Sequence, residues 1–236
     1  MEDEPLWEIE SWTLQVRQLI KKLSKFSEKS KLILILRHSE RLEPKEIGDG
    51  IELHLTEKGH KMAHLFGLKL PKERQIRIYH SVAARCKETA VDILKGFESN
   101  GGNGNIEGNL EPLHVLGVDR EFFIKELKKR PTAEFFRRWM AVLYPPHKIS
   151  RLSTYCQNAA KVIWNRFSTL PEGGIDLHVT HEILIMALRL GWFGLPPNDY
   201  WVNFLGGYAF TFKNDKILLL DNNQFLEVDY PYWWRL

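Results

Sequence analysis

Basic side chains follow directly on one short apolar stretch of the chain. Residues 32–36 are five consecutive aliphatic residues, and Arg37, His38 and Arg41 come immediately after them. Guanidinium groups bind phosphate through paired hydrogen bonds, and an imidazole beside them can act as a nucleophile or carry a proton. The residue types and their spacing therefore indicate a site for an anion, above all a phosphate, next to a reactive histidine.

Two further apolar stretches end in polar residues of the same kind. Ser81 and Arg85 follow the segment IRIYH, and His181 and Glu182 follow the segment DLHVT. A single histidine in such a place is most often structural, but two histidines with three arginines point to phosphoryl transfer. A neutral imidazole can attack phosphorus, arginines can neutralise the phosphoryl oxygens, and a carboxylic acid can protonate the leaving alcohol.

The elements that must position these residues are buried strands separated by helices. Short apolar runs bounded by polar residues are typical of strands that are buried on both faces. Helical periodicity follows the first two strands, and Thr56 is placed to cap a helix that runs from Glu57 to about Leu70. This alternation predicts an α/β fold with a parallel sheet, whose ligands bind beyond the carboxyl ends of the strands.

The rest of the chain is expected to complete one domain, residues 1–236. We expect a helical extension in residues 1–30, with its helix over 6–26, and a cap or lid insertion in residues 98–150. The insertion begins with a Gly- and Asn-rich stretch, 98–109, that predicts a mobile loop. Basic and aromatic residues then predict one or two helices broken at Pro131.

The C-terminal part predicts the second half of the sheet and its helices. We expect a helix over residues 152–169 and, after the strand that precedes His181, a buried helix closed by Gly191. The segments GGYAFTF, KILLL and FLEVDY resemble antiparallel edge strands.

Composition limits the partners that we expect. Lys plus Arg number 33 and Asp plus Glu 30, a net charge of +3, which gives no reason to expect nucleic acid. The acidic N-terminus lacks the pattern of a signal peptide, and no stretch is apolar enough to span a bilayer. Two cysteines without metal-ligand spacing favour a reduced compartment. We therefore expect a cytoplasmic protein without membrane insertion, and the oligomeric state stays open.

Four segments also resemble a known family, in its order and over most of residues 32–190. RHSER resembles the RHGxR signature of the histidine phosphatase (phosphoglycerate mutase-like) superfamily. LTEKGHKMAHLFG resembles its LTxxGxxQA segment, YHSVAARCKETA its SxxxRxxxTA segment, and VTHE the strand that ends in its second catalytic histidine. RHxxR alone is a weak signal, but the four together are specific.

The resemblance implies a three-layer α/β/α sandwich with a mostly parallel central sheet and a small helical cap. By position, it implies that His38 is the phosphorylated nucleophile and that His181 assists the transferring phosphoryl group. Arg37, Arg41 and Arg85 would bind phosphate together with His181. No metal and no organic cofactor are expected.

Two residues depart from the family pattern and are candidate substrate contacts, together with Ser81. Ser39 stands where the family usually has glycine, so that a Cβ atom lies where backbone normally approaches the ligand. His80 precedes Ser81, and it either contacts substrate or has a structural role at the strand end.

The proton donor has two candidates. One branch of the family has an acidic residue directly after the second histidine, as Glu182 follows His181 here. In the other branch the acid lies further back, and Glu111 of the segment NLEPLH is the nearest match. Glu182 is favoured, although a glutamate at a helix start can also simply stabilise the helix dipole.

The expected function is hydrolysis of a small-molecule phosphomonoester through a phosphohistidine on His38. A mutase-type phosphotransferase is the alternative enzyme, but the segment after Arg41 lacks the family's extended mutase signature. A non-catalytic module that binds a phosphorylated ligand is the alternative outside catalysis. All five basic site residues are present, which favours an enzyme.

Overall fold

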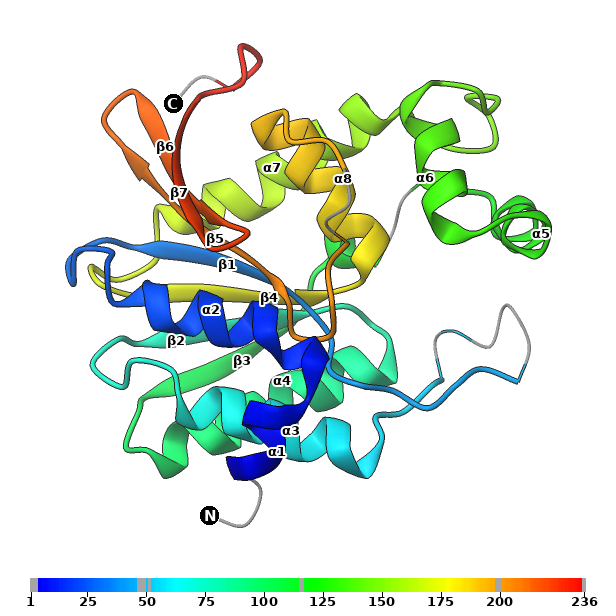
Figure 1. Cartoon of the computed structure of the whole chain (residues 1–236). Coiled ribbons are helices and arrows are strands. Elements are labelled where there is room, and N and C mark those ends of the chain that lie inside the picture. Colours follow the sequence, from blue (N-terminus) through cyan, green and yellow to red (C-terminus); the bar gives the residue numbers. More distant parts are fainter. Residues whose placement is uncertain (1–3, 46–49, 51, 115–116, 198–200, 235–236) are drawn as a thin grey trace.

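A seven-stranded mixed sheet forms the centre of the computed structural model, which describes residues 4–45, 50, 52–114, 117–197 and 201–234 (Figure 1). The strand order is β3-β2-β4-β1-β5-β6-β7. The strands are β1 Leu32–Arg37, β2 Ile76–His80, β3 Gly104–Asn109, β4 Ile175–Thr180, β5 Gly207–Lys213, β6 Lys216–Asp221 and β7 Gln224–Asp229. The first four are mutually parallel, and the last three add as antiparallel strands.

Helices cover both faces of this sheet, which confirms the three-layer α/β/α fold (Figure 1). One face carries α1 Glu4–Ile9, η1 Ser11–Thr13, α2 Leu14–Leu23, α3 Glu57–Leu68 and α4 Ala84–Ser99; the other carries α7 Leu152–Phe167 and α8 Glu182–Phe193. α5 Arg120–Lys129 and α6 Thr132–Met140 extend away from the sheet, and η2 Glu111–Leu113 precedes them. Within the described parts of the chain, no helix has the length and apolar character needed to cross a membrane.

The aliphatic residues 32–36 of the central strand β1 are fully buried because the strand contributes to both hydrophobic cores. Ile33 and Ile35 pack toward α7 and α8, whereas Leu32, Leu34 and Leu36 pack toward the α2, α3 and α4 side. Side chains of a strand alternate between its two faces, so a strand with helices on both sides must be apolar throughout. This is the physical reason for the unbroken aliphatic run before Arg37.

The mobile loop predicted over residues 98–109 is wrong. α4 continues to Ser99, and Gly104–Asn109 forms the edge strand β3, which pairs in parallel with β2. An edge strand pairs with a neighbour on one side only. Every second residue of β3 is exposed, so its sequence lacks the apolar run that marks a buried strand. Backbone pairing with β2 therefore overrides the Gly- and Asn-rich composition.

Two helix boundaries also differ from the prediction. The helix expected to close at Gly191 runs to Phe193 and ends at Gly194, whose φ of 69° is the left-handed conformation that glycine adopts at helix ends. The single helix expected over 6–26 is divided, because the Thr13 hydroxyl bonds to the carbonyls of Trp7 and Glu10 and turns the chain between α1 and α2. Trp7 is buried, so this segment packs on the core.

Other sequence predictions agree with the structure. The Thr56 side chain accepts a hydrogen bond from the Gly59 amide and so caps α3. The helix pair of the insertion is interrupted at Pro131. The three C-terminal strands are antiparallel as predicted, but of the three only β7 is an edge strand, because β5 and β6 each pair with a strand on both sides. Residues 115–116 of the insertion and 1–3 of the extension lie outside the described residues.

A buried histidine lies in the middle of β4. The His178 ring stacks on Tyr79 with centroids 5.0 Å apart, and neither ring nitrogen has a hydrogen-bond partner among the described residues. Burial, together with the charges of Arg166 and Arg77, lowers the pKa of His178 to about 3. The unfolded chain therefore binds one more proton than the folded chain as pH falls below about 6.5.

This histidine is expected to destabilise the fold in acid. Its contribution to stability is complete above pH 6.5 and is lost as pH falls toward 3, by about 2 kcal/mol between pH 7 and pH 5. His178→Leu puts an apolar side chain of similar size in place of the imidazole. Between pH 7 and pH 5 its free energy of unfolding should therefore fall by about 2 kcal/mol less than that of the wild type. Urea unfolding of both proteins at the two pH values measures the difference, and equal losses would contradict the prediction.

Candidate active site

The sheet register brings the three polar strand ends together. β4 pairs with β1 on one side and with β2 on the other, so Arg37 lies opposite Thr180, and His80 lies opposite Val179. The pairing continues beyond the strands, where the His38 amide donates to the Thr180 carbonyl and the Ser81 amide to the Val179 carbonyl. The residues that follow the three strands are therefore neighbours at one edge of the sheet.

His38 is held in one tautomer by its two hydrogen bonds. Its Nδ1 lies 2.8 Å from the Ser39 carbonyl oxygen, and the Arg85 Nε atom donates to its Nε2 over 3.0 Å. A guanidinium can only donate, so Nε2 is the acceptor and the proton of the neutral ring is on Nδ1. The lone pair of Nε2 therefore faces Arg85.

His181 continues the same chain of hydrogen bonds. A terminal nitrogen of Arg85 lies 3.0 Å from His181 Nδ1, and His181 Nε2 lies 2.9 Å from the Ser81 hydroxyl oxygen. By the same reasoning Nδ1 accepts, and Nε2 carries the proton and donates it to Ser81. One guanidinium thus connects the two imidazoles, whose ring centroids are 5.5 Å apart.

Both imidazoles are in an environment that disfavours their charged form. Burial, the neighbouring His181, and the charges of Arg85 and Arg37 lower the pKa of His38 well below its usual value. Burial and Arg85 have the same effect on the pKa of His181. His38 is only 1% exposed. Both rings are therefore neutral at neutral pH, which leaves His38 Nε2 able to act as a nucleophile.

Arg37 is held from three directions. It donates to the Val202 carbonyl over 3.0 Å, and its guanidinium lies over the Phe204 ring, 4.3 Å from the centroid. The Glu182 carboxylate lies 3.1 Å from its Nε. Burial lowers the pKa of Arg37, although a guanidinium remains charged at all ordinary pH values. Arg37 is thus a fixed positive charge beside His38.

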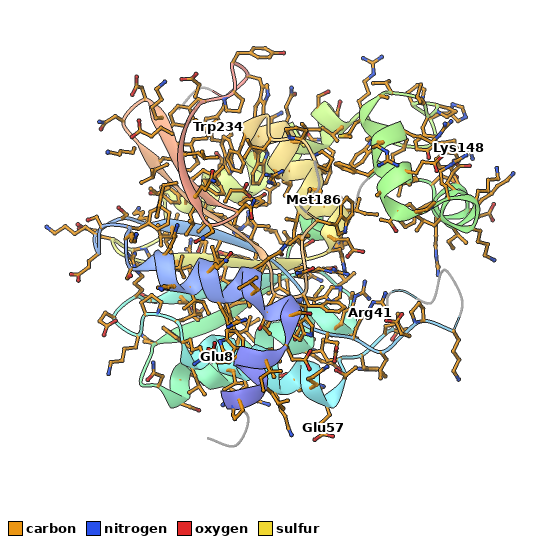
Figure 2. The ribbon with its side chains drawn as sticks, viewed as in Figure 1. Glu8, Arg41, Glu57, Lys148, Met186 and Trp234 are labelled. Atoms are coloured by element: carbon orange, nitrogen blue, oxygen red, sulfur yellow. The ribbon has the colours of Figure 1, made fainter. Side chains whose placement is uncertain are left out.

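Arg41, labelled in Figure 2, forms its hydrogen bond and its ion pair with residues of its own segment. It donates to the Leu42 carbonyl over 2.7 Å, and the Glu43 carboxylate is 3.7 Å away. Its charge contributes to the lowered pKa of His181, which indicates proximity without direct contact. The structure therefore groups Arg37, Arg85 and the two histidines tightly and leaves Arg41 more peripheral.

Ser39 and His80 make contacts within the protein. Ser39 is fully buried, and its hydroxyl donates to the Gly59 carbonyl in the first turn of α3 over 2.7 Å. His80 repeats the geometry of His38, with its Nδ1 2.8 Å from the carbonyl oxygen of the next residue, Ser81. The side chain that replaces the usual glycine is thus accommodated by packing against α3. Contacts of these residues with a substrate stay predictions.

The two candidate acids lie in different settings. Glu182 begins α8 and forms the ion pair with Arg37 described above. Glu111 is exposed at the start of η2, and it forms no ion pair with any of the described residues. η2 nevertheless lies near the same edge of the sheet, because the Thr180 hydroxyl donates to the Leu113 carbonyl.

Sequence reasoning missed several residues that shape the site. Phe204 contacts both Arg37 and His38, the latter with ring centroids 5.8 Å apart. His114 adds to the lowered pKa of His181, and the Cys86 thiol lies 3.8 Å from His181 Nε2. Burial raises the pKa of Cys86 to about 12, so the thiol packs there in its neutral form. Only His114, three residues after a candidate acid, carries a chemical signal in the sequence.

The chemistry that these residues can perform is anion binding and nucleophilic attack. Two guanidiniums and two neutral imidazoles converge on a small volume, and a carboxylate lies beside one of the arginines. Among the described residues, no group of three or more His, Cys, Asp or Glu side chains has an arrangement that could hold a metal ion.

The comparison with protein families gives one match. A model of the histidine phosphatase superfamily (branch 1) matches residues 33–211, which include all of the basic residues described above. None of the curated proteins matches the chain in sequence.

Solved structures with this fold include both phosphatases and a mutase. A mycobacterial glucosyl-3-phosphoglycerate phosphatase in complex with VO3 is 16% identical, with 85% of this chain and 99% of that chain covered and a TM-score of 0.57. An Entamoeba histolytica phosphoserine phosphatase in complex with 3-phosphoglyceric acid is 16% identical, with 83% and 96% covered and a TM-score of 0.56. A Bacillus anthracis phosphoglycerate mutase is 18% identical, with 86% and 94% covered and a TM-score of 0.50. At these identities the similarity shows the fold alone.

Proposed function

The chain belongs to branch 1 of the histidine phosphatase superfamily, and on that premise we propose that it hydrolyses a phosphomonoester through a phosphohistidine on His38. The observation that carries the proposal is the tautomer of His38. Its Nδ1 proton is engaged by the Ser39 carbonyl, so the lone pair of Nε2 lies on the side where Arg85 and His181 converge. A neutral imidazole in this state is a nucleophile without prior loss of a proton.

In the first step, Nε2 of His38 attacks phosphorus and the bond from phosphorus to the ester oxygen breaks. The phosphoryl group enters between His38 and Arg85, so the guanidinium exchanges its bonds to the imidazoles for bonds to phosphoryl oxygens. Arg37 and, from the rim, Arg41 add positive charge, which stabilises the oxygens as charge redistributes in the transition state. His181 donates a hydrogen bond to the same oxygens after a change of tautomer.

In the second step, water attacks the phosphohistidine and releases inorganic phosphate. The bond from phosphorus to Nε2 breaks, and the imidazole returns to its neutral state with the proton still on Nδ1. The carboxyl group that protonated the leaving alcohol in the first step takes a proton from the water in the second. The cycle is thus balanced in protons and needs no metal or redox partner.

We propose Glu182 as that carboxyl group, because it lies against the phosphate-binding Arg37 whereas Glu111 is exposed. Glu182→Gln should lower kcat for alkyl phosphates, whose leaving groups need a proton, by about 10²-fold. The loss should be much smaller for p-nitrophenyl phosphate, because p-nitrophenolate leaves without protonation. Steady-state kinetics on both substrates measure the contrast.

Glu111→Gln is the matched control for this prediction, since it makes the same change at the other candidate. It should leave both substrates within a factor of about three, the scatter expected for a surface substitution. A loss specific to alkyl phosphates in Glu111→Gln, with Glu182→Gln unaffected, would reverse the assignment.

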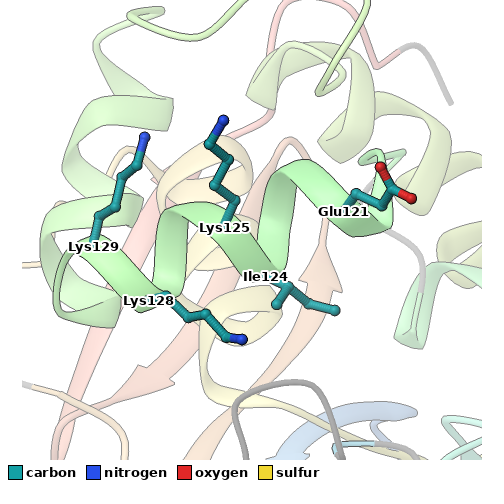
Figure 3. Close-up of a pocket in the computed structure, with 5 residues that line it drawn as sticks. All are labelled: Glu121, Ile124, Lys125, Lys128 and Lys129. Atoms are coloured by element: carbon teal, nitrogen blue, oxygen red, sulfur yellow. The ribbon is translucent and has the colours of Figure 1, made fainter.

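The helix pair α5 and α6 is proposed as the cap, within the insertion that the sequence places at residues 98–150. α5 presents a concavity of about 450 Å³ on one side, lined by Glu121, Ile124, Lys125, Lys128 and Lys129 (Figure 3). It contains none of the residues around His38. Three lysines on one helix face support a substrate whose leaving group is itself anionic.

The experiment that tests the function is an assay of phosphate release over a panel of phosphomonoesters, including sugar phosphates, nucleotides and phosphorylated acids. Hydrolysis releases inorganic phosphate in equal amount to the free alcohol. With 3-phosphoglycerate, conversion to 2-phosphoglycerate without release of phosphate would favour a mutase instead. Binding of phosphate without turnover of any compound would favour a non-catalytic module.

A further inference from the structure

A short stretch of chain between α8 and β5 supports the phosphate-binding end of β1. We call residues 201–206 the strap. The Arg37 guanidinium donates a hydrogen bond to the Val202 carbonyl, and the Arg37 backbone amide donates one to the Gly206 carbonyl. The Phe204 ring lies under the Arg37 guanidinium, and the Leu205 amide bonds to the His38 carbonyl over 3.3 Å. The position of Arg37 therefore depends on the position of the strap.

The backbone conformation of the strap is strained at one residue. Leu205 has a φ of 54°, in the left-handed region that residues with a Cβ atom avoid. Such a residue persists only where its surroundings determine the backbone. The Leu205 side chain is fully buried, and further contacts must fix the rest of the strap.

Those contacts come from the N-terminal helical segment. The side-chain amide of Gln15, in α2, forms two hydrogen bonds with the strap. Its Nε2 donates to the Trp201 carbonyl over 3.0 Å, and its Oε1 accepts from the Asn203 backbone amide over 2.8 Å. The Trp12 ring packs edge-on against Phe204 with centroids 5.7 Å apart. The N-terminal segment thus contacts the strap through Gln15 of α2 and through Trp12 of η1.

The strap is also shaped to receive this amide. A Cβ atom on Gly206 would lie 2.5 Å from Gln15 Oε1, closer than any real contact of that kind. A side chain at this position would therefore displace the Gln15 amide. Glycine here permits the close approach of α2 to the strap.

We propose that Gln15 is a positioning residue that holds Arg37 in place through the strap, so that the N-terminal helical segment is a working part of the phosphate site. The segment lies outside the residues that match the family model, which begin at 33. The proposal rests on the proposed function, in which Arg37 binds the phosphoryl group. It assigns a role to an extension that would otherwise be only an additional layer of packing.

The test compares Gln15→Leu with Lys22→Ala for binding of inorganic phosphate and for kcat/KM on p-nitrophenyl phosphate. Gln15→Leu keeps the volume of the side chain and removes both hydrogen bonds. Lys22 is on the same helix and donates to the Asn223 carbonyl, so Lys22→Ala also removes one bond between α2 and the body of the protein. Gln15→Leu should weaken phosphate binding about tenfold, as expected for a displaced binding group, and Lys22→Ala less than about twofold.

A second arm separates positioning from a general loss of stability. In an Arg37→Ala background, with phosphate binding measured by phosphorus NMR, Gln15→Leu should weaken binding further by less than about twofold, because both changes act through the same guanidinium. An equal factor in both backgrounds, or unchanged phosphate binding in Gln15→Leu alone, would overturn the proposal. If the wild type binds phosphate but turns over no substrate, the proposed function is wrong. The comparison of phosphate binding between Gln15→Leu and Lys22→Ala would still test the role of Gln15.

Discussion

Replacing His38 by alanine should abolish the covalent intermediate and lower kcat by at least about 10⁴-fold, the loss typical of a removed nucleophile. The expectation follows from the geometry around the ring. His38 presents an unprotonated Nε2 to the point where Arg85 and His181 meet, and no other described nucleophile has this position. The pKa of the ring is well below its usual range, so the neutral form persists in mild acid as well as at neutral pH.

The measurement is the trapping of labelled enzyme during turnover of a phosphorus-32 substrate. The reaction is stopped in alkaline detergent, because the bond between phosphorus and an imidazole nitrogen survives base better than acid. His60→Ala is the control: His60 lies on α3, and its Nδ1 bonds to the Asp92 carboxylate over 2.6 Å. Wild type and His60→Ala should carry label and His38→Ala should carry none, whereas label on His38→Ala would refute the assignment.

The group of basic residues could be predicted from sequence because parallel strands impose it. A strand buried on both faces must be apolar throughout, so the first polar residues after it mark its carboxyl end. Three such ends in one parallel sheet lie at one edge, so the sequence pattern alone is enough to place Arg37, Arg85 and His181 together. The same argument places His38 but assigns no tautomer to it, since the partners of its two nitrogens depend on side-chain geometry.

The strap and its support by α2 could not be predicted in this way. Gln15 and the strap are separated by more than 180 positions in the chain, and neither has a periodic pattern or a residue type that signals a site. The strap also contains Leu205 in the left-handed conformation, which sequence rules assign to glycine or asparagine. The edge strand β3 escaped prediction for a related reason, because backbone pairing leaves little trace in the side chains.

Arg85 should be the most consequential of the arginines, because one side chain bonds to both imidazoles. Arg85→Ala should lower kcat/KM by about 10³-fold, as expected when a preorganised group that stabilises transition-state charge is lost. It should also change the dependence of activity on pH. Burial is the largest cause of the lowered pKa of both His38 and His181, and the Arg85 charge lowers both further.

The direction of the pH effect follows from the nucleophile's need to be neutral. Activity falls on the acid side as His38 becomes protonated, and the lowered pKa keeps this limb of the profile well below pH 6.5 in the wild type. Without the Arg85 charge the pKa of His38 rises, so the acid limb of kcat/KM should move to higher pH in Arg85→Ala. Arg85→Lys keeps the positive charge, but an ammonium group cannot bond to both imidazoles as the planar guanidinium does. In this variant kcat/KM should fall, while the acid limb of its pH profile stays near that of the wild type. An unmoved limb in Arg85→Ala, or an equal shift in both variants, would show that the charge of Arg85 does not control the protonation of the nucleophile.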